Sequence, residues 1–263
     1  MPFNERNSKL VWTESIRQAE EVLQHWVSND SPITETAKDM RTLSLHVLSG
    51  AGFGKFYSFN SSTEPPKLGH MFNYRDSLSL ILENILLIFI FGSNIFTSRY
   101  LPESWARIGQ AIIDFKSYMR DMYKEEKHLL DSGKPGTDNI VACLVRASEA
   151  ATTSLGNAST PKVLRHPKTG SKGLTESEVY GNIFVYNFAG HDTTAITLSW
   201  TLYLLAAHLE VQDWIFEEIN LYIPDVDSAS ESYDAVFPKL KRCFAVLVCP
   251  LIPPGTPSLH TRH

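Results

Sequence analysis

One segment of the chain, from Leu174 to Leu209, constrains the fold more than any other. Its sequence, LTESEVYGNIFVYNFAGHDTTAITLSWTLYLLAAHL, places apolar residues on nearly all sides of a helix, which is typical of a helix buried in a core. Thr175 and Glu178 have the spacing of a capping box. We therefore predict one long helix over about residues 175–207, which at roughly 1.5 Å per residue is about 48 Å long.

A polar run, AGHDTT, interrupts this helix at Ala189–Thr194. A charged residue inside an apolar helix is costly unless it is paired or has a chemical task. Ala189 and Thr193 lie on one face, and a Thr hydroxyl can bond the carbonyl four residues back. The run predicts a notch with Asp192 and Thr193 beside it as an acid–alcohol pair for proton delivery. A polar kink, in which Asp192 and Thr193 only satisfy backbone groups, is the alternative that these residues leave open.

Composition narrows the class of protein. The chain has 263 residues, of which 43% are hydrophobic, so it can bury a substantial core. Its net charge is -5 and it has no Lys/Arg-rich run, which predicts no nucleic-acid partner. Adjacent His191 and Asp192 diverge by about 100° on a helix and are poorly placed to share a metal ion. The N-terminus has no apolar core, so we expect neither a signal peptide nor an anchor.

Apolar residues recur at spacings of three and four in the rest of the chain, which predicts further helices. They are expected to contain residues 12–26, 40–48, 78–91, 102–131, 138–151, 211–219 and 238–247. Gly50 is expected to end the second of these helices. The very apolar stretch 78–91 is too short to span a bilayer, so we interpret it as a buried helix, with contact to a membrane surface as the alternative. No segment alternates as a strand does, and the predicted fold class is all-α.

The run AGHDTT resembles the A/G-G-x-D/E-T-T motif in the long central helix of the haem-thiolate monooxygenases, the cytochrome P-450 family. FNERNSKLVWTESIRQA, LSGAGFG, LSWTLYLLAAHLEVQDWIFEEI and YDAVFPKLKRCFAVL resemble other segments of fungal members, in the family's order. The resemblance spans roughly Phe3 to Leu247. It implies the central part of the cytochrome P-450 fold, with a partial family domain over residues 1–247 and an irregular tail over residues 248–263.

The resemblance also implies a haem cofactor and roles for residues in the long helix. Ala189 and Gly190 would lie against the haem and form the oxygen groove. Asp192 and Thr193 would relay protons to dioxygen, so that one oxygen atom is inserted into an organic substrate.

A small hydrophobic substrate and a redox partner reductase follow from the same resemblance. Phe184 and Phe188 would line the substrate pocket, with ordinary core packing as the alternative. The family implies attachment to the endoplasmic reticulum membrane, whereas this sequence, which shows no signal or anchor, predicts a cytoplasmic chain.

Two motifs of the family do not occur in this sequence: E-x-x-R, and the F-x-x-G-x-R-x-C-x-G loop whose Cys supplies the thiolate ligand of the iron. Cys143, Cys243 and Cys249 have none of the flanking residues of that loop, so we predict no axial ligand and no metal site. Loss of the thiolate removes the chemistry, and we expect this chain to be inactive. The alternative to an enzyme is a non-catalytic helical remnant, as a regulatory or pseudogene product.

Overall fold

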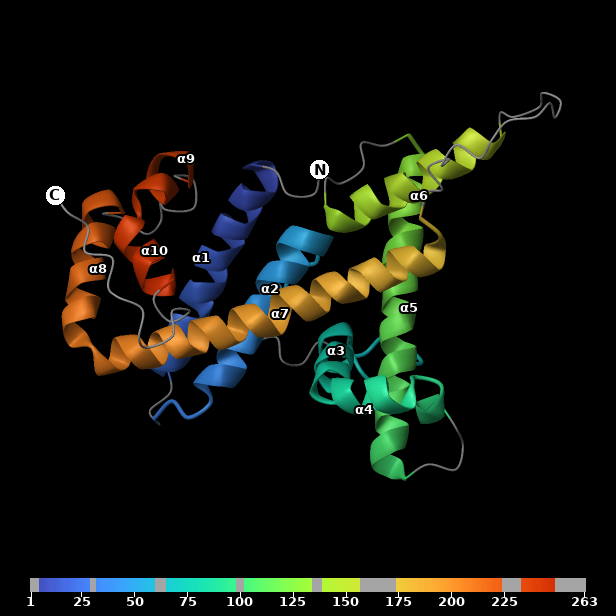
Figure 1. Cartoon of the computed structure of the whole chain (residues 1–263), viewed down its shortest axis with the longest axis horizontal. Helices are drawn as coiled ribbons and strands as arrows, with labels where there is room; N and C mark the ends of the chain where they lie inside the picture. Colours follow the sequence, from blue (N-terminus) through green and yellow to red (C-terminus); the bar gives the residue numbers. More distant parts are fainter. Residues whose placement is uncertain are drawn as a thin grey trace.

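The computed structural model of the chain describes residues 5–28, 32–59, 65–97, 102–133, 139–156, 174–223 and 233–248. The regular structure in these ranges is helical, without a strand, which confirms the predicted all-α class. The elements are α1 (Glu5–Ser28), α2 (Thr36–Phe53), α3 (Tyr74–Glu83), α4 (Ile85–Phe91), η1 (Ile95–Thr97), α5 (Glu103–Asp131), α6 (Ile140–Gly156), α7 (Glu176–Ala207), α8 (Leu209–Tyr222), α9 (Tyr233–Val236), η3 (Phe237–Lys239) and α10 (Lys241–Val248) (Figure 1). Apart from Val248, the expected irregular tail, residues 248–263, lies outside the described residues.

Helix α7 runs through the whole arrangement and contacts most of the other helices (Figure 1). Its start has the predicted capping box, in which the Thr175 hydroxyl accepts the Glu178 N–H at 3.3 Å and the Glu178 carboxylate accepts the Thr175 N–H at 2.7 Å. Helices α5 and α6 pack against its first half, α2 against its middle, and α8 and α10 against its second half. The predicted long helix is therefore confirmed, with bounds close to those expected.

Only one face of α7 is buried, although its composition predicts burial on nearly all sides. Six of the buried residues recur every four positions along the helix, namely Val179, Ile183, Asn187, His191, Ala195 and Ser199, and Thr201 is buried near its end. Val185, Phe188, Ile196 and Trp200 are exposed on the other side. The helix thus has a buried stripe that includes polar residues and an open stripe that is largely apolar.

Two hydrophobic clusters lie along α7. The larger forms where α3, α5 and α6 meet the first half of α7, and includes Leu78, Phe115 and Ile183. The smaller lies between α1, α2 and α7, and is built on Val22 and Ala195 together with Met40 and Phe59. Because Ile183 belongs to the first cluster and Ala195 to the second, the AGHDTT run lies at the junction of the two cores.

Helix α2 ends later than expected. Gly50 lies inside the helix, and Gly54 ends it with a positive φ of 68° and an N–H that donates to the Gly50 carbonyl at 3.0 Å. A Cβ atom at Gly50 would lie 3.0 Å from the Phe56 ring, so this position is glycine for close packing. The prediction of a stop at Gly50 is wrong, because this glycine serves close packing inside the helix and the left-handed residue that ends the helix is Gly54.

The very apolar stretch 78–91 is two helices, not one. Asn84 separates α3 from α4, and its side chain donates to the Leu80 carbonyl at 2.9 Å. Helix α4 has no buried residue, and Leu86, Phe89 and Ile90 are exposed, so the expected burial of this stretch holds for α3 only. Among the described residues, no helix is long and apolar enough to cross a membrane.

Helix α10 is attached to α8 through a carboxylate. Buried Glu218 accepts the backbone N–H of Arg242 at 2.9 Å and that of Cys243 at 3.0 Å. Burial alone would raise the pKa of Glu218, but the hydrogen bonds to Arg242 and Cys243 outweigh it, and the pKa lies below its ordinary value. The charged carboxylate is therefore the form that stabilises this contact.

Glu218→Gln is expected to lower the free energy of unfolding at neutral pH and to have little effect in acid. A group with a depressed folded pKa contributes stability above its unfolded pKa, about 4.3, and loses it as the pH falls through the folded pKa. Urea unfolding between neutral and acid pH measures the difference between the wild-type chain and the variant. Exposed Glu217→Gln is the matched control, with a small effect at every pH. A Glu218→Gln difference that does not shrink in acid would contradict this role.

Candidate functional site

The six residues of the AGHDTT run point to three different surroundings. Ala189 and Thr193 share the exposed face of α7, and the Thr193 hydroxyl donates to the Ala189 carbonyl at 2.5 Å. This confirms the bond expected from their spacing. Helix α7 is continuous through the run, from Glu176 to Ala207. On this face the small side chain of Ala189 lies one turn before the Thr193 side chain.

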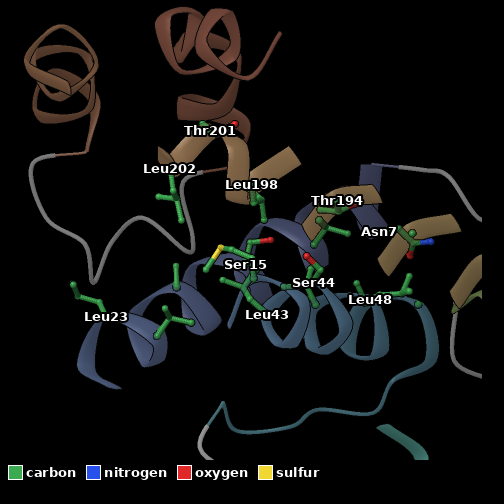
Figure 2. Close-up of a pocket in the computed structure, with 18 of the residues that line it drawn as sticks. Asn7, Ser15, Leu23, Leu43, Ser44, Leu48, Thr194, Leu198, Thr201 and Leu202 are labelled. Carbon is green, nitrogen blue, oxygen red and sulfur yellow. The ribbon is translucent and has the colours of Figure 1, made fainter. Parts of the chain in front are cut away.

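Gly190 and Thr194 face α2 and α1 instead. A Cβ atom at Gly190 would lie 3.3 Å from Leu48 Cδ2, so glycine allows α2 to approach α7 closely. Both residues line a cavity of about 640 Å³ between α1, α2 and α7, whose other lining residues are mostly apolar. Figure 2 shows Leu48 and Leu198 at its wall, beside Thr194. The structure therefore places Gly190 away from the face that Ala189 and Thr193 share.

Asp192 points toward α2. Its Oδ1 lies 3.1 Å from Nε of Arg41, and both side chains are about half exposed. His191 precedes it on the buried stripe, where burial lowers the pKa of its imidazole below the ordinary value. Asp192 and His191 both line a second, polar cavity of about 380 Å³ between α2, α3 and α7. Asp192 and Thr193 are thus adjacent in the chain, but the Asp192 side chain lies toward α2 and the Thr193 side chain lies on the exposed face of α7.

The two phenylalanines expected at a substrate pocket stack on each other, with ring centres 6.3 Å apart and nearly parallel planes. Phe184 is partly buried and meets Phe115 of the larger core edge to face. Phe188 is 44% exposed and stands on the same open side as Ala189. Phe188 is therefore an exposed ring that stacks on Phe184, which is anchored in the larger core.

Sequence reasoning missed the residues of other helices that contact this region. Arg41 meets Asp192 across 151 positions of sequence, and the Tyr74 hydroxyl donates to Asn187 Oδ1 at 2.7 Å across 113 positions. Tyr74 is buried, and Asn187 also donates to the Ile183 carbonyl at 2.8 Å. No local pattern marks Arg41 or Tyr74, because their roles depend on packing between distant helices.

Comparison with known proteins identifies the family. The family model of cytochrome P450 matches residues 3–243. The chain belongs to the cytochrome P450 family. A cytochrome P450 monooxygenase of Arthrobotrys oligospora is 26% identical over 97% of this chain and 45% of that relative. Cytochrome P450 monooxygenase 124 of Postia placenta is 28% identical over 94% of this chain and 44% of that relative.

A solved P450 structure shows the same fold. The crystal structure of the cytochrome P450DA heme domain superposes with a TM-score of 0.57 and 19% identity, over 85% of this chain and 41% of that one. The chain thus spans less than half the length of these P450 relatives. Membership in this family of monooxygenases confirms the predicted resemblance, its fungal type, and haem as the family's cofactor.

The open face of α7 is largely apolar, and the small, exposed Ala189 lies near exposed Phe188 and Ile196, so an apolar group would fit against it. The described cysteines do not fit the role of axial ligand. Cys243 lies against Glu218, and burial followed by that carboxylate raises the pKa of its thiol to about 11, so it is protonated. Cys143 lies in α6, and no group of three or more potential metal ligands occurs in the described ranges.

Proposed function

We propose that α7 is the dioxygen-facing helix of a haem-dependent monooxygenase that inserts one oxygen atom into a small hydrophobic organic substrate. The arrangement of Ala189, Asp192 and Thr193 carries the proposal. Within one turn, an open apolar face holds a small residue and a hydroxyl, while the adjacent carboxylate reaches a polar cavity through Arg41. A proton donor between a polar and an apolar environment is what the reduction of dioxygen needs.

Each residue of the proposed site has a separate task. The haem supplies the redox chemistry when it is bound. Ala189 leaves room for dioxygen at the helix surface, and Phe188 provides an apolar wall for the substrate. Asp192 takes up and releases the proton, and the Thr193 hydroxyl, which already donates to the Ala189 carbonyl, retains lone pairs that can accept a further hydrogen bond. Gly190 contributes indirectly, because its contact with Leu48 sets the distance between α7 and α2.

We also propose that the chain with this sequence does not complete the haem site and is inactive by itself. The sequence lacks the cysteine loop of the family, and the Cys243 thiol is held in its protonated form. The alternative is a non-catalytic helical protein with a regulatory role. This chain would be inactive in that case too, and no longer, active monooxygenase would correspond to it.

The purified chain, mixed with haem, reduced and treated with carbon monoxide, is expected to give no Soret band of the thiolate type. The physical reason is that the sequence lacks the family's cysteine loop, whose thiolate is the ligand that produces this band. Absorption spectroscopy measures it, with monooxygenase 124 of Postia placenta as the positive control. A thiolate-type band from this chain would overturn the proposed inactivity.

A redox partner reductase and attachment to the endoplasmic reticulum membrane belong to the same proposal. Both follow from the family, and the exposed apolar side chains of α4, among them Leu86 and Phe89, support contact with a lipid surface. The reductase and the membrane attachment are proposed for the complete monooxygenase.

A further inference from the structure

The open face of α7 carries apolar side chains along several turns of the helix. Val185, Ile196 and Trp200 are 57%, 45% and 60% exposed, and the small residue Ala189 lies exposed between the first two of them. The Trp200 ring meets exposed Tyr203 edge to face at a centre distance of 6.2 Å, so these two rings already hold each other in place. A continuous apolar patch of this kind marks an interaction site.

The order of residues on this face is self-complementary about the peptide bond that follows Asp192. Ala189 and Ile196 are equally far from this bond along the chain, and so are Val185 and Trp200. In each pair the smaller residue comes before the bond and the larger residue comes after it. Two antiparallel copies of α7 that cross at this bond therefore set every larger residue against the smaller residue of its pair in the other copy. A two-fold axis forms each such contact twice, because both copies use the same surface.

The charges at the crossing point do not oppose this pairing. Between residues 185 and 204, Asp192 is the only acidic residue and buried His191 is the only basic one. Asp192 Oδ1 lies 3.1 Å from Nε of Arg41, so its carboxylate is already paired. A two-fold axis at the crossing brings two carboxylates and two guanidinium groups together, and each carboxylate can face a guanidinium of either copy.

The area of this face fits a dimer that dissociates on dilution. Its six large apolar side chains are about half exposed, and they are Val185, Phe188, Ile196, Trp200, Tyr203 and Leu204. Because a fully buried aromatic side chain covers roughly 150–250 Å², the six together offer about 500 Å² on one copy and about 1,000 Å² in a dimer. That total lies at the lower limit of specific protein–protein interfaces.

We propose that the open face of α7 binds the same face of a second copy of this chain, as an antiparallel helix pair whose two-fold axis passes beside Asp192. The chain by itself is then a reversible homodimer. Because the second copy covers Ala189, the dimer and any group bound at Ala189 exclude each other. The dimer concerns this chain alone, and it does not depend on whether α7 faces dioxygen in a complete monooxygenase.

Sedimentation velocity of the full chain, between about 1 and 100 μM, is expected to show a monomer that converts into a dimer as the concentration rises. Trp200→Ala removes the largest side chain of the face and is expected to raise the dissociation constant at least about tenfold, as for a central hot-spot residue. Phe216→Ala in α8 is the matched control, because Phe216 is also 60% exposed but belongs to another helix. Its dissociation constant should stay within about twofold of the wild-type value.

Three results of this experiment would overturn the proposal. They are a wild-type chain that stays monomeric at the highest concentration, association that continues beyond a dimer, and equal effects of Trp200→Ala and Phe216→Ala. Far-UV circular dichroism shows whether both variants keep the helical content of the wild-type chain.

Disulfide cross-linking of the full chain tests the antiparallel arrangement without weakening the interface. Thr193 lies next to the crossing point, so Thr193→Cys is expected to form a disulfide with its counterpart in the second copy under mild oxidation. Val185→Cys is the control, because the two copies of this position lie about 22 Å apart along the helix axis, beyond the reach of a disulfide. Mass spectrometry of the linked peptides separates these disulfides from those of Cys143 and Cys243. Equal cross-linking of the two variants, as in a parallel pair, or none at Thr193→Cys would overturn the proposal.

Discussion

Asp192→Asn is expected to lower product formation about 100-fold in a complete P450 that contains this α7, because a positioned proton donor contributes at least that factor. Asn has nearly the same shape as Asp and can still meet Arg41, but it cannot take up and release a proton. The suitable protein joins residues 3–243 of this chain to the remaining segments of the Arthrobotrys oligospora monooxygenase, which the chain matches along most of its length. Product, hydrogen peroxide and consumed NADPH are measured together, and peroxide is expected to take the place of product.

Arg41→Gln is the control for this experiment. It breaks the ion pair with Asp192 and keeps the acid, and a pair between half-exposed side chains contributes only about 0–1 kcal/mol. Product formation in Arg41→Gln is therefore expected to fall much less than in Asp192→Asn. If both variants lose activity equally, the ion pair and not the proton explains the effect. If Asp192→Asn keeps full coupling of NADPH to product, the proposed role of Asp192 is wrong.

The parts of this site that the sequence predicts are those set by spacing within one helix. The capping box of Thr175 and Glu178 and the bond from Thr193 to Ala189 each join residues three or four apart. Such contacts follow from helix geometry alone, whatever surrounds the helix. The same holds for the position of α7, whose bounds match the expected ones within a residue or two.

The parts that the sequence does not predict depend on which side of α7 is buried. Apolar residues occur at nearly every angle around α7, so the sequence does not show which face is buried. The buried face also contains the polar residues Asn187, His191 and Ser199. Asn187 can be buried because Tyr74 and the Ile183 carbonyl satisfy its amide, and Ser199 because it donates to the Ala195 carbonyl. Hydropathy counts such residues as surface, so the contact of Gly190 with Leu48 of α2 emerges only from the packed structure.

The position of Gly109 in α5 leads to the largest expected effect on stability. A Cβ atom there would lie 1.9 Å from the carbonyl oxygen of Phe96 and 2.7 Å from its carbonyl carbon. Phe96 is buried in η1, and its ring packs against Trp105 at a centre distance of 5.2 Å. Backbone atoms cannot rotate away as a side chain can, so any residue but glycine must push η1 off α5 and open the larger core.

Gly109→Ala is expected to lower the free energy of unfolding by about 3 kcal/mol, at the upper end of the cost of overpacking. For a chain of this size, that corresponds to a fall in Tm of roughly 6–12 °C, measured by circular dichroism on heating. Gly181→Ala in α7 is the matched control, because a Cβ atom there meets nothing within 4 Å. Removing a glycine from an exposed helix position stabilises by about 0.5–1 kcal/mol, so the same substitution should have opposite signs at the two sites. Equal changes at Gly109 and Gly181 would mean that the approach of η1 to α5 does not determine the stability of this core.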